Sequence, residues 1–293
     1  MKIKKIKVKN IITKSNLPVC EYSVNPYIGC QHACKYCYAC FMKRFTGHNE
    51  KWGEFIDIKF CDKIKNPEKY KDKELFIGSV TDAYQPCEIE YQRTRTLLEE
   101  LKGSGAKLSI ATKSDLILRD LDLIKTFPNA RVLWSINTID ERFKNDMDNS
   151  VSIERKFEAM KKFHDSGIRT ACFISPIFPK LTDVKSIIDR AKDKCNLIWL
   201  ENLNLRGDFK QAILDYIQQT YPELTELYTE LYNKGNNSYW KNLDNELQVY
   251  AKKINLEYKT NDDSFLNDFE AKPIIVNYFY HSKIKKSALN KNK

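Results

Sequence analysis

The chain of 293 residues contains no run of about 18 apolar residues, so we expect no membrane-spanning helix. The lysines near its start are not followed by an apolar region or a small-residue cleavage site, which argues against a signal peptide. The number of cysteines is nine, which is odd, and no other feature of the sequence is typical of a secreted protein. A disulfide framework is therefore disfavoured, and reduced cysteines predict a cytoplasmic protein.

Acidic residues are missing from both ends of the chain. Residues 1–15 contain six lysines and residues 282–293 contain five, with no Asp or Glu in either segment. The formal net charge is +10, so the two ends, at +11 together, leave the segment between them near −1. These basic tails could bind a polyanion such as a nucleic acid, or they could be solvated, frayed ends. The sequence leaves both interpretations open.

Short apolar segments alternate with helical patterns over most of the chain. An apolar content of 42% is ordinary for a globular protein, and the length fits one large domain or a domain with an appendage. We expect strands at 21–27, 75–80, 107–112, 131–136, 169–174 and 196–200. Helical periodicity predicts helices at 88–102, 116–127, 152–166 and 182–194.

Strands that alternate with helices predict a parallel sheet with right-handed crossovers. Six such units suit an incomplete barrel, so we predict an α/β fold with a partial (β/α)6 barrel over residues 16–206. The composition changes at Gly207, and residues 207–281 are expected to form a mainly helical extension with one strand at 274–280. This extension would cap the open side of the barrel.

Three cysteines in one short segment are the strongest functional signal. Cys30, Cys34 and Cys37 have the spacing C-x3-C-x2-C, and Tyr36 places an aromatic ring just before the third. Iron–sulfur clusters are held by cysteine thiolates, and a [4Fe–4S] cube has four iron corners. Three protein ligands leave one iron open to a small molecule, which suits chemistry better than electron storage.

Two other metal sites stay in consideration. Zinc usually takes paired C-x2-4-C elements, and one pair with a leading cysteine fits that pattern poorly. Cys40 follows Cys37 by three residues and could complete a closed four-cysteine cluster. Cys61, Cys172 and Cys195 are expected to be structural.

Polar side chains follow the predicted strands at their carboxyl ends, where α/β barrels place their chemistry. The ends of the second, third and fourth strands carry Thr81, Asp82, Lys113, Ser135 and Asn137, and the fifth and sixth strands also end in polar residues. Each of these residues alone is typical of loop capping. Five polar strand ends on the same side as the cysteines predict a binding pocket.

The cysteine spacing, with its aromatic residue, resembles the signature of the radical S-adenosylmethionine (SAM) superfamily. This resemblance implies a [4Fe–4S] cluster whose open iron binds SAM. It also implies reductive cleavage of SAM, hydrogen abstraction from a substrate, and a radical SAM partial barrel. An electron donor such as flavodoxin or ferredoxin would be a partner.

Further motifs between residues 20 and 205 are similar to the spore photoproduct lyase-related branch, often labelled DNA repair photolyase. They lie at 25–30, 79–88, 112–120 and 135–137. The chain resembles still more closely the radical SAM mobile pair protein B group, through the segments 41–48, 173–179, 199–206 and 278–281. That resemblance implies a second radical SAM protein as a partner.

The lyase resemblance places Thr81, Lys113 and Ser135 in the SAM pocket, and Tyr36, Asp82 and Asn137 complete the set of cofactor-binding residues that we expect. One departure concerns radical transfer, because the lyase has a hydrogen-donating cysteine where this chain has Ser79. A serine hydroxyl does not readily donate a hydrogen atom, so the lyase relay is not expected here. Cys87 and Tyr84 are the candidate catalytic residues for a relay in its place.

We therefore expect a radical SAM enzyme of the lyase or modifying type with nucleic acid as the favoured substrate. A peptide or protein substrate is one alternative. A non-catalytic iron–sulfur protein, serving in electron transfer or as a sensor, is the other. The basic tails and the branch resemblance favour nucleic acid, and Cys40 decides between an open and a closed cluster.

Overall fold

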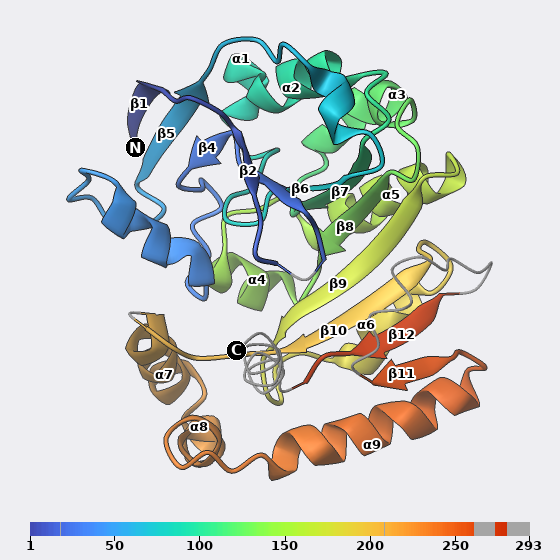
Figure 1. Ribbon diagram of the computed structural model, residues 1–293. Helices are drawn as coiled ribbons and strands as arrows, with labels where there is room; N and C mark the ends of the chain where they lie inside the picture. Colours follow the sequence, from blue (N-terminus) through green and yellow to red (C-terminus); the bar gives the residue numbers. More distant parts are fainter. Residues whose placement is uncertain (18, 208, 261–272, 280–293) are drawn as a thin grey trace, which may run out of the picture.

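The computed structural model describes residues 1–17, 19–207, 209–260 and 273–279 (Figure 1). Within these residues the main sheet has nine strands in the order β11-β12-β10-β9-β8-β7-β6-β3-β2. They are β2 (Ile12–Lys14), β3 (Tyr22–Val24), β6 (Glu74–Ile77), β7 (Lys107–Thr112), β8 (Arg131–Ser135), β9 (Arg169–Ile177), β10 (Leu197–Asn202), β11 (Tyr258–Thr260) and β12 (Ile274–Asn277). The expected tail 282–293 and His281 lie outside the described residues.

Six of these strands, from β3 to β10, are the parallel strands expected from the sequence, and their spatial order follows the chain. The predicted α/β fold with a parallel sheet is therefore confirmed. The connecting helices are α1 (Glu88–Tyr91), α2 (Arg93–Leu101), η3 (Leu116–Asp120), α3 (Leu121–Ile124), α4 (Glu141–Met147), α5 (Ile153–Asp165) and α6 (Val184–Ala191). The predicted helix 88–102 divides into α1 and α2 because Gln92 takes a left-handed conformation with φ of 45°.

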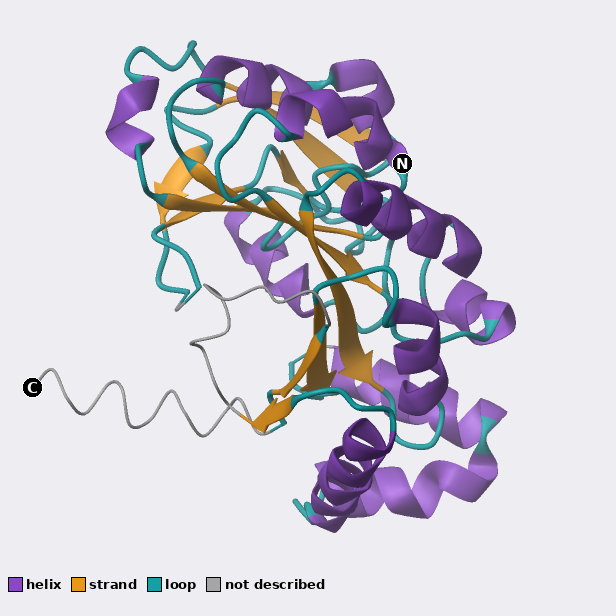
Figure 2. Ribbon diagram, turned by 90° about the vertical axis from the view of Figure 1, so that its right-hand side faces the viewer, coloured by secondary structure: helices purple, strands orange, loops and turns teal. Residues whose placement is uncertain are grey.

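The two faces of the sheet carry different side chains because successive residues of a strand point to opposite sides. On one face, residues such as Val132 and Ile198 belong to a core that also contains residues of the surrounding helices. On the other face, Leu133 and Trp199 belong to a smaller cluster formed chiefly by strand residues. Figure 2 shows the helices gathered outside the curved sheet. Within the described residues, the inner-face cluster contains no helix residue, and this face leads to the strand ends that carry the predicted pocket.

The N-terminal basic segment forms strands rather than a free tail. β1 (Lys2–Lys7) pairs in parallel with β5 (Phe55–Phe60), and β5 also pairs with β4 (Tyr27–Ile28) in a separate three-stranded sheet. Residues 1–15 were expected to form a basic tail. Part of this segment is instead the paired strand β1, because β5 provides hydrogen-bond partners for the β1 backbone. The lysines of β1 are still exposed, so the positive charge stays on the surface. The segment between β4 and β6 also contains the 3-10 helices η1 (Tyr38–Phe45) and η2 (Pro67–Tyr70).

The C-terminal part continues the main sheet and packs under the cysteine segment. It contains α7 (Phe209–Thr220), η4 (Pro222–Leu224), α8 (Thr225–Tyr232) and α9 (Ser238–Lys253), followed by β11 and β12. β12 pairs in parallel with β10 and extends the sheet on the side opposite β3. Ile213 and Ile217 of α7 share a buried cluster with Tyr36 from the cysteine segment. No helix in the described part of the chain is long and apolar enough to cross a membrane.

A buried ion-pair network fixes the connection that follows β6. The Glu88 side chain is fully buried and accepts hydrogen bonds from Arg119 Nη2 at 2.8 Å, from the backbone N–H of Thr94 at 2.9 Å, and from the Tyr27 hydroxyl. Asp120, also fully buried, accepts from the same Arg119 at 2.8–2.9 Å. The network joins β4, α1, α2 and η3, and it holds the carboxyl end of the 78–88 segment that faces the cysteines.

We predict that Glu88→Ala lowers the free energy of unfolding by about 3–5 kcal/mol, because it leaves the Arg119 guanidinium and the Tyr27 hydroxyl without their buried acceptor. Urea denaturation of the variant and the wild type measures this difference. The matched control is Glu99→Ala, which removes a half-exposed partner of Arg95 on the same helix. Its effect should stay below about 1 kcal/mol, and equal losses in both variants would contradict the argument.

Candidate functional site

The cysteine segment is a loop that polar side chains after β6 hold in place. Gly29 has a φ of 93°, and a Cβ atom there would lie 2.2 Å from the Phe55 carbonyl oxygen, so a side chain does not fit. The carbonyl oxygen of Gly29 accepts hydrogen bonds from Thr81 Oγ1 (2.6 Å) and Gln85 Nε2 (3.4 Å). Gln85 Oε1 accepts from the backbone N–H of Gln31 at 2.8 Å. The backbone around the first cysteine is thus fixed from both sides.

Cys30, Cys34 and Cys37 lie close enough for their charges to interact. Cys30 is buried, and the other two are partly exposed. Burial raises the pKa of all three thiols, and ionised neighbours, including Cys34 and Cys37, raise the pKa of Cys30 further. The Lys113 ammonium group opposes this effect at Cys34 and Cys37 because it favours their thiolate forms. Three thiolates in this environment need a positive group among them, which iron ions provide.

The number and chemistry of these donors fit the expected cluster. Within the described ranges, no group of three or more His, Cys, Asp or Glu side chains is placed so that it could hold a metal ion. A [4Fe–4S] cluster has a different requirement, because each thiolate binds its own iron corner. The three cysteines, all with free thiols, match that requirement in chemistry and number.

Asp82 is the buried carboxylate between the cysteine loop and the sheet. Its oxygens accept hydrogen bonds from Thr112 Oγ1 (2.9 and 3.1 Å) and from the backbone N–H groups of Tyr84 (2.8 Å) and Lys113 (2.7 Å). His32 Nε2, in the cysteine loop, lies 3.0 Å from Asp82 Oδ2. Burial acts to raise the pKa of Asp82, but His32 and the hydrogen bonds outweigh it and lower that pKa. A charged Asp82 therefore joins the loop to the ends of β6 and β7.

Four polar side chains form a row across the carboxyl ends of four neighbouring strands, which we call the inner row. It consists of Lys113, Ser135, Ser175 and Glu201, each two positions beyond a residue of the inner-face cluster. Lys113 Nζ donates a hydrogen bond to Ser135 Oγ, which donates to the Ser175 carbonyl oxygen at 3.1 Å. Ser175 Oγ in turn donates to Glu201 Oε2 at 3.0 Å. Burial raises the pKa of Glu201 to about 7, although this hydrogen bond acts against the shift.

Tyr36 connects the inner row to the cysteine loop. Lys113 Nζ lies 5.6 Å from the centre of its ring, and the ring packs edge-on against Phe178 with centroids 5.5 Å apart. Tyr36 Oη donates to Asp148 Oδ2 at 3.0 Å. Burial opposes the ionisation of Asp148, but Lys156, Lys113 and nearby hydrogen bonds lower its pKa to about 2. The ring and the lysine of the predicted pocket are therefore held by a charged carboxylate.

Asn137 carries a buried donor that the protein does not use. The residue is 4% exposed, and its Nδ2 atom makes no hydrogen bond with any residue that the structure describes. Its backbone carbonyl oxygen accepts from Thr182 Oγ1 at 2.8 Å, which fixes the position of the residue. An unsatisfied buried polar group costs about 1–3 kcal/mol. A ligand with a carboxylate or hydroxyl acceptor at this point would satisfy the amide, as the SAM-pocket prediction requires.

The other predicted site residues have different surroundings. Thr81 and Asp82 have their side chains engaged by protein groups, so their expected contacts with a cofactor stay predictions. The two relay candidates lie in hydrophobic clusters: Tyr84 is fully buried in the main core, and Cys87 packs with Tyr27. Burial, followed by Glu88 in importance, raises the pKa of Cys87 to about 12. The structure does not bring either candidate into the inner row.

Tyr38 and Glu201 belong to this region but were not among the predicted site residues. Tyr38 Oη donates a hydrogen bond to the carbonyl oxygen of Ser79, so it connects the cysteine loop to the end of β6. Burial raises the pKa of Tyr38, and the charge of Cys37 and that of Glu201 act in the same direction. In the sequence, the signal that Tyr38 belongs to the site was its position directly after Cys37. Glu201 was visible only as one more polar residue at a strand end.

Trp52 lies beside the third cysteine and comes from the segment that precedes β5. Its neighbour Gly53 has a φ of 94° and approaches the loop so closely that a Cβ atom would lie 2.6 Å from that of Ala33. The Trp52 side chain acts on the Cys37 thiol and lowers its pKa, against the larger effect of burial. The ring packs edge-on against Phe55 with centroids 5.9 Å apart. The segment 46–55 thus forms one wall of the cysteine site.

Comparisons with known proteins agree with this arrangement. The family model of the radical SAM superfamily matches residues 24–191, which is more than half of the chain. An uncharacterised protein of Methanocaldococcus jannaschii is 41% identical over 232 residues, covering 78% of this chain and 86% of that protein. An uncharacterised protein of Mycobacterium tuberculosis is 27% identical and covers 73% of this chain and 68% of its own length. An uncharacterised protein of Acidianus two-tailed virus is 28% identical, with coverages of 73% and 79%.

Solved structures share the fold at low sequence identity. A mutant of spore photoproduct lyase with bound AdoMet and dinucleoside spore photoproduct has a TM-score of 0.54 and 15% identity. Spore photoproduct lyase complexed with dinucleoside spore photoproduct has a TM-score of 0.54 and 16% identity. Each match covers 75% of this chain and 66% of the lyase chain. At this identity the likeness concerns the fold alone.

We predict that Asp82→Asn reduces the iron bound per chain after anaerobic reconstitution several-fold, because the amide turns a donor toward the Thr112 hydroxyl and two backbone N–H groups. It should also lower the free energy of unfolding by about 2–4 kcal/mol. Iron determination and thermal denaturation measure the two effects. Asp115→Asn is the matched control, since Asp115 pairs with the exposed Arg155 near the end of the same strand. Full iron retention by Asp82→Asn would refute the positioning role.

Proposed function

Because the chain belongs to the radical SAM superfamily, we propose that Cys30, Cys34 and Cys37 hold a [4Fe–4S] cluster for the reductive cleavage of SAM and hydrogen abstraction from a substrate. When bound, the cluster supplies one electron and an open iron for SAM. With SAM bound at that iron, the products would be methionine and, after hydrogen transfer from the substrate, 5′-deoxyadenosine.

The observation that carries this proposal is the electrostatic interaction of Lys113, in the inner row, with two of the three thiols. Lys113 acts on Cys34 and Cys37 and reaches Ser135 at the same time. A cation at that point suits the carboxylate of SAM, since charge-assisted hydrogen bonds are the stronger ones. The unused Asn137 amide supplies a further donor on the same side. Tyr36 offers a ring face beside the lysine.

Glu201 has a separate role in this pocket. With a pKa of about 7, its carboxyl group holds a proton over much of the range below neutral pH. In that state it donates a hydrogen bond and adds no negative charge beside the thiolates. We assign it to the recognition of SAM or of the substrate at the far end of the inner row from Lys113.

Nucleic acid is the substrate class that we favour. The lysines of β1 are exposed, and a basic surface attracts a phosphate backbone through counterion release. The solved lyase structures with a dinucleoside photoproduct support the same substrate class by analogy of fold. Ser79 stands where the lyase has its hydrogen-donating cysteine, so the reaction after hydrogen abstraction differs from that of the lyase.

The proposal includes partners and a location. A reduced electron carrier such as flavodoxin or ferredoxin supplies the electron, and a second radical SAM protein acts with this one. This protein would meet both partners in the cytoplasm, where thiols stay reduced. A peptide or protein substrate is the alternative to nucleic acid, and nucleic acid binding at low salt discriminates between them.

A non-catalytic iron–sulfur protein is the alternative to an enzyme, and it rests on Cys40. That residue lines the cavity next to the loop, and its sulfur atom lies 4.0 Å from the Tyr38 carbonyl oxygen. If it moved to bind the fourth iron, the cluster would be closed to SAM.

We predict that alanine at position 30, 34 or 37 abolishes iron binding and the production of 5′-deoxyadenosine, whereas Cys40→Ala leaves both intact. The physical reason is that three thiolates hold the cluster and the fourth iron must stay open. Iron determination and chromatography of the products from reduced, reconstituted protein with SAM give the two measurements. If Cys40→Ala removes the cluster and the wild-type protein makes no 5′-deoxyadenosine, the closed-cluster alternative is supported.

We predict that Lys113→Ala weakens SAM binding by roughly tenfold or more, equivalent to about 1.4 kcal/mol or more. Lys113→Arg, which keeps the charge, should recover part of the affinity. Isothermal titration of the reconstituted protein with SAM measures the change, and iron content shows that the cluster is present. Lys144 is a matched control because it is another buried lysine, with Ser150 as partner. If Lys113→Ala binds SAM as the wild type does, the assigned contact is wrong.

A further inference from the structure

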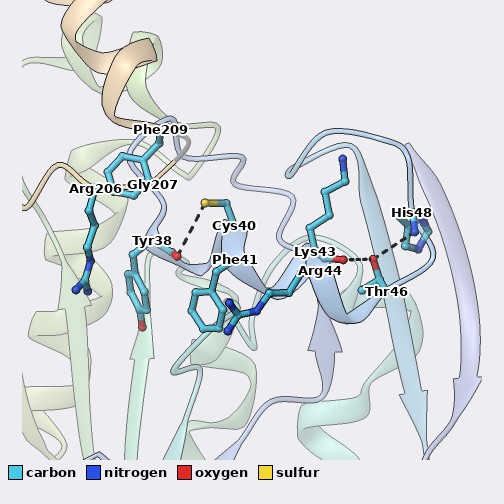
Figure 3. A pocket seen from close by; sticks show the side chains of 10 residues that line it. All are labelled: Tyr38, Cys40, Phe41, Lys43, Arg44, Thr46, His48, Arg206, Gly207 and Phe209. Atoms are coloured by element: carbon cyan, nitrogen blue, oxygen red, sulfur yellow. Dashed lines mark hydrogen bonds between the residues drawn. The ribbon is translucent and has the colours of Figure 1, made fainter.

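A cavity of about 700 Å³ opens beside the cysteine loop and combines aromatic and basic side chains. Its described lining consists of Tyr38, Cys40, Phe41, Lys43, Arg44, Thr46, His48, Arg206, Gly207 and Phe209. These come from η1 with the residues after it, and from the connection between β10 and α7. We call it the η1 groove (Figure 3). No Asp or Glu occurs among these lining residues.

Large aromatic rings are exposed on this side of the protein. Phe41 is 40% exposed, Tyr38 is 52% exposed, and Phe45, which follows Arg44 in η1, is 64% exposed. Burial of such rings is normally favourable, by about 25 cal/mol for each Å² of apolar surface. Three exposed rings within eight residues therefore form a surface suited to a flat ligand or to an apolar partner.

Arginine side chains accompany the rings. The guanidinium carbon of Arg44 lies 5.4 Å from the centre of the Phe41 ring and 4.7 Å from that of the Phe45 ring. Figure 3 shows Arg44 against Phe41, with Arg206 running beside Tyr38. The Arg44 guanidinium group over these rings holds positive charge at the same place as the flat apolar surface.

Tyr38 links the groove to the end of β6, beside the predicted pocket. Tyr38 lines the groove, and its hydroxyl reaches the Ser79 carbonyl oxygen at the end of β6. One residue is therefore shared between the groove and the region where SAM is proposed to bind. A chain molecule lying along the groove would lead one of its units to the site of hydrogen abstraction.

We propose that a single-stranded segment of nucleic acid binds in the η1 groove and over the adjacent Phe45, with bases stacked on Phe41 and Phe45 and phosphates near Arg44 and Arg206. This inference rests on the proposed function, and it specifies the form of the substrate and the surface that holds it. Stacking on exposed rings requires bases that are not already stacked in a duplex. Flat rings with interleaved arginines are how sequence-tolerant single-strand binding is achieved elsewhere. A protein partner with an acidic surface is the competing occupant.

The test is fluorescence anisotropy with a labelled single strand of about 12 nucleotides, the same sequence as a duplex, and reconstituted full-length protein. We expect the single strand to bind more tightly than the duplex, and its affinity to fall as salt rises. Phe45→Ala and Phe41→Ala should each weaken single-strand binding roughly tenfold, which is about 1.4 kcal/mol. Arg44→Lys keeps the charge but removes the planar group, and it should weaken binding several-fold.

Two controls separate the groove from the rest of the surface. Ile89→Ala removes an exposed apolar side chain on α1, and Lys185→Ala removes an exposed cation on α6, so both should bind as the wild type does. Iron content and thermal denaturation show whether the groove variants are folded.

The outcomes distinguish this inference from the proposed function. Salt-dependent single-strand binding that Phe41→Ala and Phe45→Ala leave unchanged overturns the groove and keeps nucleic acid as substrate. Tighter binding to the duplex also overturns it. No binding to either form at low salt overturns the groove and the nucleic acid substrate together, whereas the production of 5′-deoxyadenosine still decides the radical SAM activity.

Discussion

The arrangement of the site depends on one buried carboxylate. Asp82 accepts hydrogen bonds from the Thr112 hydroxyl and from backbone N–H groups at the ends of β6 and β7, and it also meets His32 in the cysteine loop. A loop that carries three thiols has little apolar surface to bury, so its position cannot come from hydrophobic packing alone. A charged group in a buried place makes strong, directional bonds. Asp82 therefore sets where the thiols stand relative to the strand ends.

Strand geometry supplies the second constraint. Inward and outward positions alternate, so Ala111, Leu133 and Trp199 fix the direction of Lys113, Ser135 and Glu201 two residues later. Because the strands are parallel, the polar ends all meet at one edge of the sheet. The inner row is thus a result of the same register that builds the core, and the chemistry needs no separate scaffold.

The parts of this structure that local sequence patterns govern could be predicted. Apolar runs predict the six parallel strands. The spacing of Cys30, Cys34 and Cys37 predicts that these residues lie close together. Contacts between distant segments could not be predicted, because alternation and spacing carry no information on pairing. The parallel pairing of β1 with β5 and the Tyr38 contact with Ser79 are of this kind. The same limit applies to the roles of Thr81 and Asp82, since a polar residue at a strand end serves a ligand or the scaffold equally well.

Burial sets the unusual state of Glu201. On the cysteine side, Lys113 acts on the charged Asp148, whose pKa is about 2, and on the thiols of Cys34 and Cys37. A fully charged carboxylate at the end of the inner row would compete for the same cation. Burial raises the pKa of Glu201 to about 7, so near neutral pH the group keeps its polar contacts while much of its charge is suppressed. The inner row therefore extends a polar surface over four strands without placing a second full negative charge in line with Lys113.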